Sequence, residues 1–172
     1  MNAIALVGSS AFLVAQLAAQ APSFTTFGNP CPSDPPPLAA LSLPRIGQTF
    51  QMQARSGGST SQGYEGGVAA AVVMGLSDTT WLGQPLPLAP AALQALFPGV
   101  FSCGDVAVAA DVMIQLPFQI PRGPVVVSMP IPNDVALVGF AFHVQAVDFR
   151  GHMTHQTLGL ELGTAARVVV GL

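Results

Sequence analysis

The stretch Leu137-Val-Gly-Phe-Ala-Phe-His-Val-Gln-Ala-Val147 decides the fold class, because its side chains alternate along most of its length. In an extended chain, successive side chains point to opposite faces. Every second residue from Phe140 to Ala146 is apolar, which predicts a strand with one face in the core. The two faces carry Phe140, Phe142, Val144 and Ala146 on one side, and Ala141, His143, Gln145 and Val147 on the other.

Several other short segments have the composition of strands. Gln48 to Arg55 alternates between apolar and polar residues, and the flanking turn residues of Gly67 to Leu76 favour a buried strand over a helix. The remaining strand regions are Val106 to Leu116, Val125 to Met129, Thr157 to Leu162 and Val168 to Val170.

One helical turn is predicted for Pro90 to Phe97, between Pro90 near its start and Pro98-Gly99 at its end. Many short strands, separated by Gly and Pro and without regular alternation with helices, are typical of an antiparallel architecture. The sequence therefore predicts an all-β, antiparallel β-sandwich of the jelly-roll or Ig-like kind, with at most one short helix.

The N-terminal residues 1–21 have the features of a signal peptide. They contain no charged side chain, an apolar stretch runs from Ala3 to Val14, and Ala19-Gln20-Ala21 has the small-x-small pattern of a cleavage site. A short membrane anchor is the alternative interpretation of the same stretch. We expect residues 22–37 to form a Pro-rich lead-in, residues 38–172 to form a single domain, and the protein to be secreted or on the cell surface, without a membrane span after signal removal.

The charge content excludes two classes of partner. Charged residues make up 8% of the chain, against roughly 25% in an ordinary soluble domain. The five cations are scattered arginines, so neither nucleic acid nor an anionic membrane would meet a basic patch. A surface so poor in charge favours contact with another surface, such as a second copy of the chain or a surface polysaccharide.

Cys31 and Cys103 are the two cysteines of the chain. An even pair in an exported protein predicts one disulfide, which by chain entropy could stabilise the fold by roughly 4 kcal/mol. Two free thiols, one of them a nucleophile, are the alternative.

An ordered series of short motifs runs from Phe27 to the C-terminus and resembles a β-rich domain that recurs in exported proteins of planctomycetes and related bacteria. That resemblance implies a secreted or surface-located module, with no biochemical activity to carry over. Domains of this kind usually have an aromatic residue at the position of His143. The segments that carry the resemblance are Phe27 to Cys31, Pro44 to Phe50, Met74 to Ser77, Pro85 to Leu88, Cys103, Ile131 to Asn133, Leu137 to Gly139, Phe142 to Ala146 with Asp148, and Thr157-Leu158.

Three histidines, His143, His152 and His155, could supply an open zinc or copper site, or they could be polar residues of a strand and a turn. Trp81 and Tyr64 could stack on a sugar ring, or they could be partly buried in the core. Gln145, a polar residue in an apolar strand, could contact a ligand or satisfy a buried backbone group.

Carboxylate pairs for glycoside hydrolysis are possible in principle, but most of the acidic residues stand beside Gly, Ser or Pro, where Asp serves turns. The sequence has no Gly-x-Ser-x-Gly elbow and no phosphate-binding lysine loop, so we expect no catalytic residue and no cofactor. The acidic residues considered are Glu65, Asp78, Asp105, Asp111, Asp134, Asp148 and Glu161.

Three functions remain open on the sequence. The first is a non-enzymatic exported or cell-surface sandwich with a structural, adhesive or self-assembling role. The second is a carbohydrate-binding module that uses Trp81 and Tyr64. The third is a small metalloenzyme with a histidine-bound ion.

Overall fold

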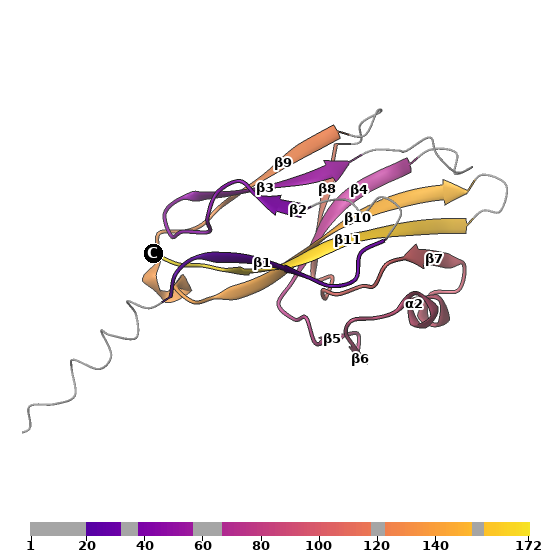
Figure 1. Ribbon diagram of the computed structural model, residues 1–172. Coiled ribbons are helices and arrows are strands. Elements are labelled where there is room, and N and C mark those ends of the chain that lie inside the picture. Colours follow the sequence, from indigo (N-terminus) through magenta and orange to yellow (C-terminus); the bar gives the residue numbers. More distant parts are fainter. Residues whose placement is uncertain (1–19, 32–37, 57–66, 118–122, 153–156) are drawn as a thin grey trace, which may run out of the picture.

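The computed structural model describes residues 20–31, 38–56, 67–117, 123–152 and 157–172 of the chain. Two β-sheets pack face to face around an apolar core, and a helix-bearing segment covers the outer face of the larger sheet (Figure 1). The predicted all-β, antiparallel sandwich is therefore confirmed. Its described part contains one short α-helix, and one 3-10 turn, η1 (Val135–Leu137).

The larger sheet has the strand order β1-β11-β10-β4-β8, and β7 pairs with β11 as well. All pairings in it are antiparallel except that between β7 and β11. The strand β10 lies near its centre and bonds to β4 on one side and β11 on the other. The bounds are β1 (Ser23–Phe27), β4 (Gly67–Gly75), β7 (Val100–Cys103), β8 (Val112–Leu116), β10 (Ala141–His152) and β11 (Thr157–Val169).

The smaller sheet has the order β2-β3-β9, from β2 (Leu38–Ala40), β3 (Thr49–Ser56) and β9 (Gly123–Pro130). The alternation predicted for β3 is confirmed, because Phe50, Met52 and Ala54 are all fully buried. They pack against Phe142, Val144 and Ala146 of β10 and their neighbours across the sandwich. Across the sandwich, β2 contacts β11, and β3 contacts β4 and β10. The third strand of the smaller sheet, β9, therefore lies on the same side of the sandwich as β8.

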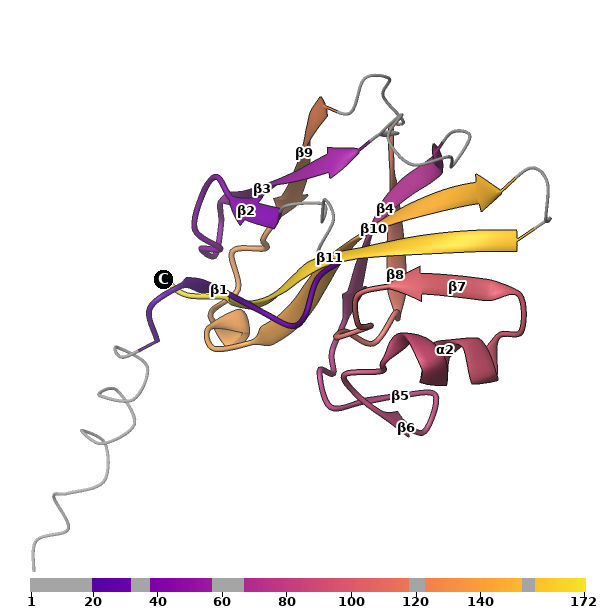
Figure 2. The ribbon, with the colours of Figure 1, turned by 45° about the vertical axis from the view of Figure 1, so that its right-hand side comes forward.

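Residues 76–111, here called the covering segment, connect β4 to β8 (Figure 2). Most of the segment lies over the outer face of the larger sheet, and its strand β7 pairs with β11 at the edge of that sheet. The segment contains β5 (Thr80–Trp81), β6 (Gln84–Pro85), α2 (Pro90–Leu96) and β7. Its Leu88 and Leu93 form a second apolar cluster with Val73, Val147 and Leu162 of the sheet. Both faces of β10 are therefore buried, one in the sandwich and the other under the covering segment.

The covering segment approaches the sheet closely at Gly75. A Cβ atom at Gly75 would lie only 1.9 Å from the carbonyl oxygen of Ala109. The backbone there is bonded on both sides of the glycine, from Ala109 N–H to Ser77 O and from Asp111 N–H to Met74 O. Only glycine fits at this point, because any side chain would push the two segments apart.

Several sequence expectations on the elements differ from the structure in detail. The predicted strand from Val106 to Leu116 is a strand only from Val112, because residues 106–110 cross the outer face of the sheet. The strand predicted from Leu137 begins at Ala141, after η1. Ser23–Phe27, within the expected lead-in of residues 22–37, forms the edge strand β1, for which no strand was predicted.

The predicted disulfide between Cys31 and Cys103 is present, with a Cα–Cα distance of 4.9 Å. It joins the segment after β1 to the end of β7. Cys31 is fully buried, and its N–H donates to the carbonyl oxygen of Leu162 in β11. The bridge thus fixes the N-terminal segment and the covering segment at the same place on the larger sheet.

Candidate functional site

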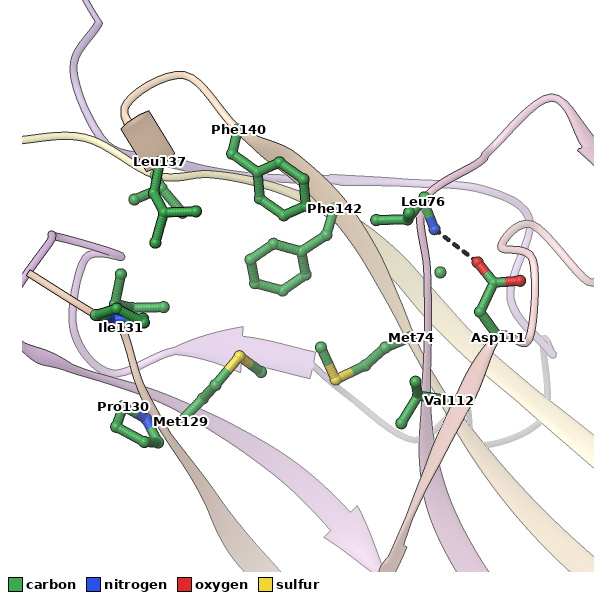
Figure 3. Close-up of a pocket in the computed structure, with 13 residues that line it drawn as sticks. Met74, Leu76, Asp111, Val112, Met129, Pro130, Ile131, Leu137, Phe140 and Phe142 are labelled. Atoms are coloured by element: carbon green, nitrogen blue, oxygen red, sulfur yellow. Dashed lines mark hydrogen bonds between the residues drawn. The ribbon is translucent and has the colours of Figure 1, made fainter. Parts of the chain in front are cut away.

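An apolar pocket opens at the end of the sandwich where β4, β9 and β11 end and β8 and β10 begin (Figure 3). Its volume is about 330 Å³. Both sheets and η1 contribute to its wall, so the pocket enters the space between the two layers. The lining residues are Met74, Gly75, Leu76, Asp111, Val112, Met129, Pro130, Ile131, Pro132, Leu137, Phe140, Phe142 and Val170.

The wall of the pocket is made of two opposed rows of apolar side chains. Leu137, Phe140 and Phe142 point into it from one side, and Met74 and Met129 point into it from the other (Figure 3). The two phenyl rings are inclined at 31°, with their centroids 6.3 Å apart. Such a wall suits an apolar ligand, because it offers dispersion contacts and almost no polar partner.

Asp111 is the charged residue of the pocket lining, and it lies at the start of β8. Its Oδ2 accepts a hydrogen bond of 2.9 Å from the backbone N–H of Leu76 (Figure 3). The carboxylate is thereby held at the rim, where the side chain remains exposed.

Gln145, a predicted ligand candidate, is fully buried and bonds to backbone groups of the covering segment and of β11. Its Nε2 donates to the carbonyl oxygens of Asp105 and Gly163, each at 2.9 Å. Its Oε1 accepts from the N–H of Ala107 at 3.0 Å. Both donors and the acceptor are used by backbone, so the structure places Gln145 in the structural role.

His143 is only 6% exposed, and it faces the covering segment. Its Nε2 lies 3.4 Å from Oδ2 of Asp78, and its ring makes an edge contact with Phe27, with 6.0 Å between centroids. Neither ring nitrogen makes a hydrogen bond to the described residues. Burial lowers the pKa of His143; the Asp78 carboxylate opposes this shift and Arg167 adds to it.

The three histidines cannot bind a single ion. His143 and His152 belong to the same strand, β10, which pairs with β11 over nearly its whole length. Nine residues at about 3.3 Å each place their backbones roughly 30 Å apart. The side chain of His152 and all of His155 lie outside the described residues. Within the described residues, no group of three or more His, Cys, Asp or Glu side chains comes together as a metal site would require.

Trp81 is half-buried in β5, where it packs on the apolar cluster beneath the covering segment. Its ring lies near that of Phe97, with 6.1 Å between centroids. Tyr64 lies outside the described residues. Part of the Trp81 side chain is thus packed within the protein, which leaves less of the indole for stacking on a sugar.

Two of the acidic residues, Asp148 and Glu161, face each other across β10 and β11. Glu161 forms an ion pair with Arg150, which is buried like Asp148. Asp134 accepts from the N–H of Ala136 and so begins η1, the turn role that its sequence context predicts. Glu65 lies outside the described residues.

No family model, curated protein or solved structure matches this chain. Among the helices in the described ranges, none has the length and hydropathy needed to cross a membrane. Functional inference therefore depends on the geometry of the chain itself.

Sequence reasoning missed the apolar pocket. Its lining comes from the ends of strands and from turns, including Pro130-Ile131-Pro132 and η1. The available signal was the clustering of methionine and phenylalanine at strand ends, at Met74, Met129 and Phe140. That signal identifies a pocket only once the ends of β4, β9 and β10 are known to meet.

Proposed function

We propose that this protein is an exported, non-enzymatic β-sandwich that acts by associating with copies of itself through the side of the sandwich formed by β8 and β9. This side is here called the open edge. The observation that carries the proposal is that, within the described residues, two edge strands on the same side of the sandwich carry no charge, expose apolar side chains and lack a partner strand on their outer sides.

The backbone of the open edge is available for pairing. Among the described residues, β8 pairs only with β4, and β9 pairs only with β3. Within the described residues, each strand therefore has one row of N–H and C=O groups that pairs with no other strand. Such a row is a template for strand addition by another chain.

The side chains of the open edge add apolar surface. Val112 and Met113 of β8 are 56% and 57% exposed, and Val126 of β9 is 50% exposed. Soluble proteins usually protect an edge with charge, especially lysine. Neither β8 nor β9 contains a charged residue, and the prolines of β9 stand near its two ends, at Pro124 and Pro130.

The charge of the whole chain is compatible with close packing of copies. The formal net charge is -3 over 172 residues, so repulsion between copies is small. The disulfide and the signal-like residues 1–21 support an extracellular location, where thiols are oxidised. The resemblance to exported β-rich domains supports the same location.

Light scattering on the oxidised protein tests the association. We expect the wild-type mass to rise with concentration above that of one chain. The double variant Met113→Lys/Val126→Lys should raise the dissociation constant at least tenfold, because lysine on an edge must lose its hydration when strands pair. Leu96→Lys, on α2 in the covering segment, is the matched control and should behave as wild type.

A wild-type protein that stays monomeric at high concentration would contradict the proposal. The same holds if the double variant associates as strongly as Leu96→Lys. Export is checked separately, by N-terminal sequencing of protein secreted by its own host. Removal of residues 1–21 is the expected result.

A further inference from the structure

We propose that the apolar pocket binds the alkyl chain of an amphiphile whose head group donates hydrogen bonds, a hydroxyl or an ammonium, with this head group at Asp111. This proposal does not depend on the self-association proposed above, because the ligand of the pocket is a small molecule and not a second copy of the chain.

The size of the pocket fits a medium-length alkyl chain. Ligand sites have volumes of roughly 300 Å³ and more, and the pocket has about 330 Å³. An engineered apolar cavity of about 150 Å³ binds benzene, which has six carbons. Twice that volume accommodates a chain of about ten carbons.

The wall chemistry selects hydrocarbon over sugar or peptide. The thioethers of Met74 and Met129 are flexible and polarisable, so they adapt to a chain that can bend. Pro130 and Pro132 carry no N–H, and the N–H of Ile131 between them already donates to Gln48 O. This part of the wall therefore has no free donor for a polar ligand.

The charge at the rim selects the head group. The Asp111 carboxylate is held at the mouth through Oδ2, and its Oδ1 accepts no hydrogen bond from the described residues. A hydroxyl or ammonium can donate to this oxygen, and an ammonium also gains from the opposite charge. A fatty-acid carboxylate or a phosphate head group would place two anions side by side, which is unfavourable.

Isothermal titration calorimetry with three eight-carbon probes, 1-octanol, octylamine and octanoate, tests the proposal at pH 7. We expect the alcohol and the amine to bind with one-to-one stoichiometry, and octanoate to bind at least tenfold more weakly. Shortening the alcohol should weaken binding about three- to fourfold for each methylene removed, as expected for burial of hydrocarbon.

Two variants of η1 locate the site. Leu137→Trp should fill the pocket and reduce octanol affinity at least tenfold, because Leu137 lines it. Val135→Trp is the matched control: this residue belongs to the same turn and is exposed, but it is not part of the lining. Neither residue lies on β8 or β9, so both variants should keep the self-association of the wild type.

Asp111→Asn tests the head-group contact and remains informative if Leu137→Trp does not fold. The amide oxygen of asparagine can still accept from Leu76 N–H, so the rim is preserved. Octanoate affinity should rise at least threefold in this variant, and octylamine affinity should fall by a similar factor.

Several results would overturn the proposal. The first is the absence of saturable binding of any probe to the wild type. The second concerns relative affinities: equal loss of octanol binding in the two η1 variants contradicts the site, and stronger binding of octanoate than of octanol contradicts the head group. The third is dissociation of wild-type oligomers by octanol together with loss of association in Leu137→Trp, which would make a second copy of the chain the occupant.

Discussion

The His143 imidazole lies in a place where its charged form is disfavoured. It is buried beneath the covering segment, and neither nitrogen is hydrogen-bonded within the described part of the chain. The charged groups that act on it are Asp78, at 3.4 Å, and Arg167, directly across the strand pair on β11. Burial has the largest effect and lowers the pKa, so the folded protein favours the neutral ring.

This shift has a defined consequence for stability. The unfolded chain binds a proton at His143 near pH 6.5, whereas the folded chain binds it only at lower pH. The contribution of the neutral His143 ring to the free energy of unfolding is therefore present above about pH 6.5. This contribution decreases as the pH falls below that value. In His143→Phe, which keeps an aromatic ring but cannot titrate, this component of the pH dependence should be absent.

Urea unfolding between pH 5 and pH 8 measures the effect. The difference in unfolding free energy between wild type and His143→Phe isolates this residue, since all other titrating groups are shared. We expect the wild type to lose stability relative to the variant as the pH falls from 7 to 5. A relative gain at low pH would mean that Asp78 outweighs burial and that the sign of the shift is wrong.

At the scale of elements, alternation predicted which residues of a strand share a face but not what lies over that face. In β10, Phe142 and Val144 point into the sandwich as predicted. The opposite face, with His143 and Gln145, is buried as well, because the covering segment lies on it. For Gln145 the sequence left open a ligand contact or a buried backbone partner, and only the structure shows the backbone groups that its amide contacts.

Long-range pairing also explains the wrong element boundaries. Apolar composition predicted a strand from Val106, but residues 106–110 bond to Leu88, Ser77 and Gln145 instead of to a sheet neighbour. Proline-rich composition predicted a lead-in, but the part up to Phe27 pairs with β11. The apolar pocket could not be predicted for the same reason, since distant strand ends create it.

The disulfide contributes to the stability of the fold, because it fixes the end of β7 and the segment after β1 to each other. The bridged cysteines are 72 residues apart in sequence. A loop of that length corresponds to about 4 kcal/mol in the chain-entropy description. We expect Cys31→Ala/Cys103→Ala to lower the free energy of unfolding by about 2–5 kcal/mol in urea titrations.

Dithiothreitol provides the control for this experiment. It should destabilise the wild type by a similar amount and leave the double alanine variant unchanged. If the variant is as stable as the oxidised wild type, the hydrogen bonds around Leu162 and Asp105 are sufficient to hold the two segments without the bridge.

For the whole molecule, the main question is whether its three layers unfold as one unit. The core of the sandwich lies on one face of the larger sheet, and the cluster under the covering segment lies on the other. The polar links between sheet and covering segment include the pairing of β7 with β11 and the side chain of Gln145, which bonds to backbone groups of Asp105 and Ala107. Buried backbone groups that lose such partners cost about 1–3 kcal/mol each.

Trp81 makes this coupling measurable, because it is the single tryptophan of the chain and lies in the covering segment. Its fluorescence reports the covering segment, while far-ultraviolet circular dichroism reports the sheets. In the wild type, the two urea transitions should coincide, since both layers share the larger sheet. In Gln145→Leu, the fluorescence transition should move to lower urea than the dichroism transition.

Gln94→Leu is the matched control, a glutamine on the exposed surface of α2, and its two transitions should stay together. If Gln145→Leu moves both transitions by the same amount, the apolar cluster of Leu88, Leu93 and Val147 is sufficient to couple the layers. In that case His143 would become exposed only when the sandwich itself unfolds, and the titration of His143 would report the stability of the whole molecule. If the transitions separate, the covering segment is a distinct cooperative unit whose coupling to the sheet depends on the Gln145 amide.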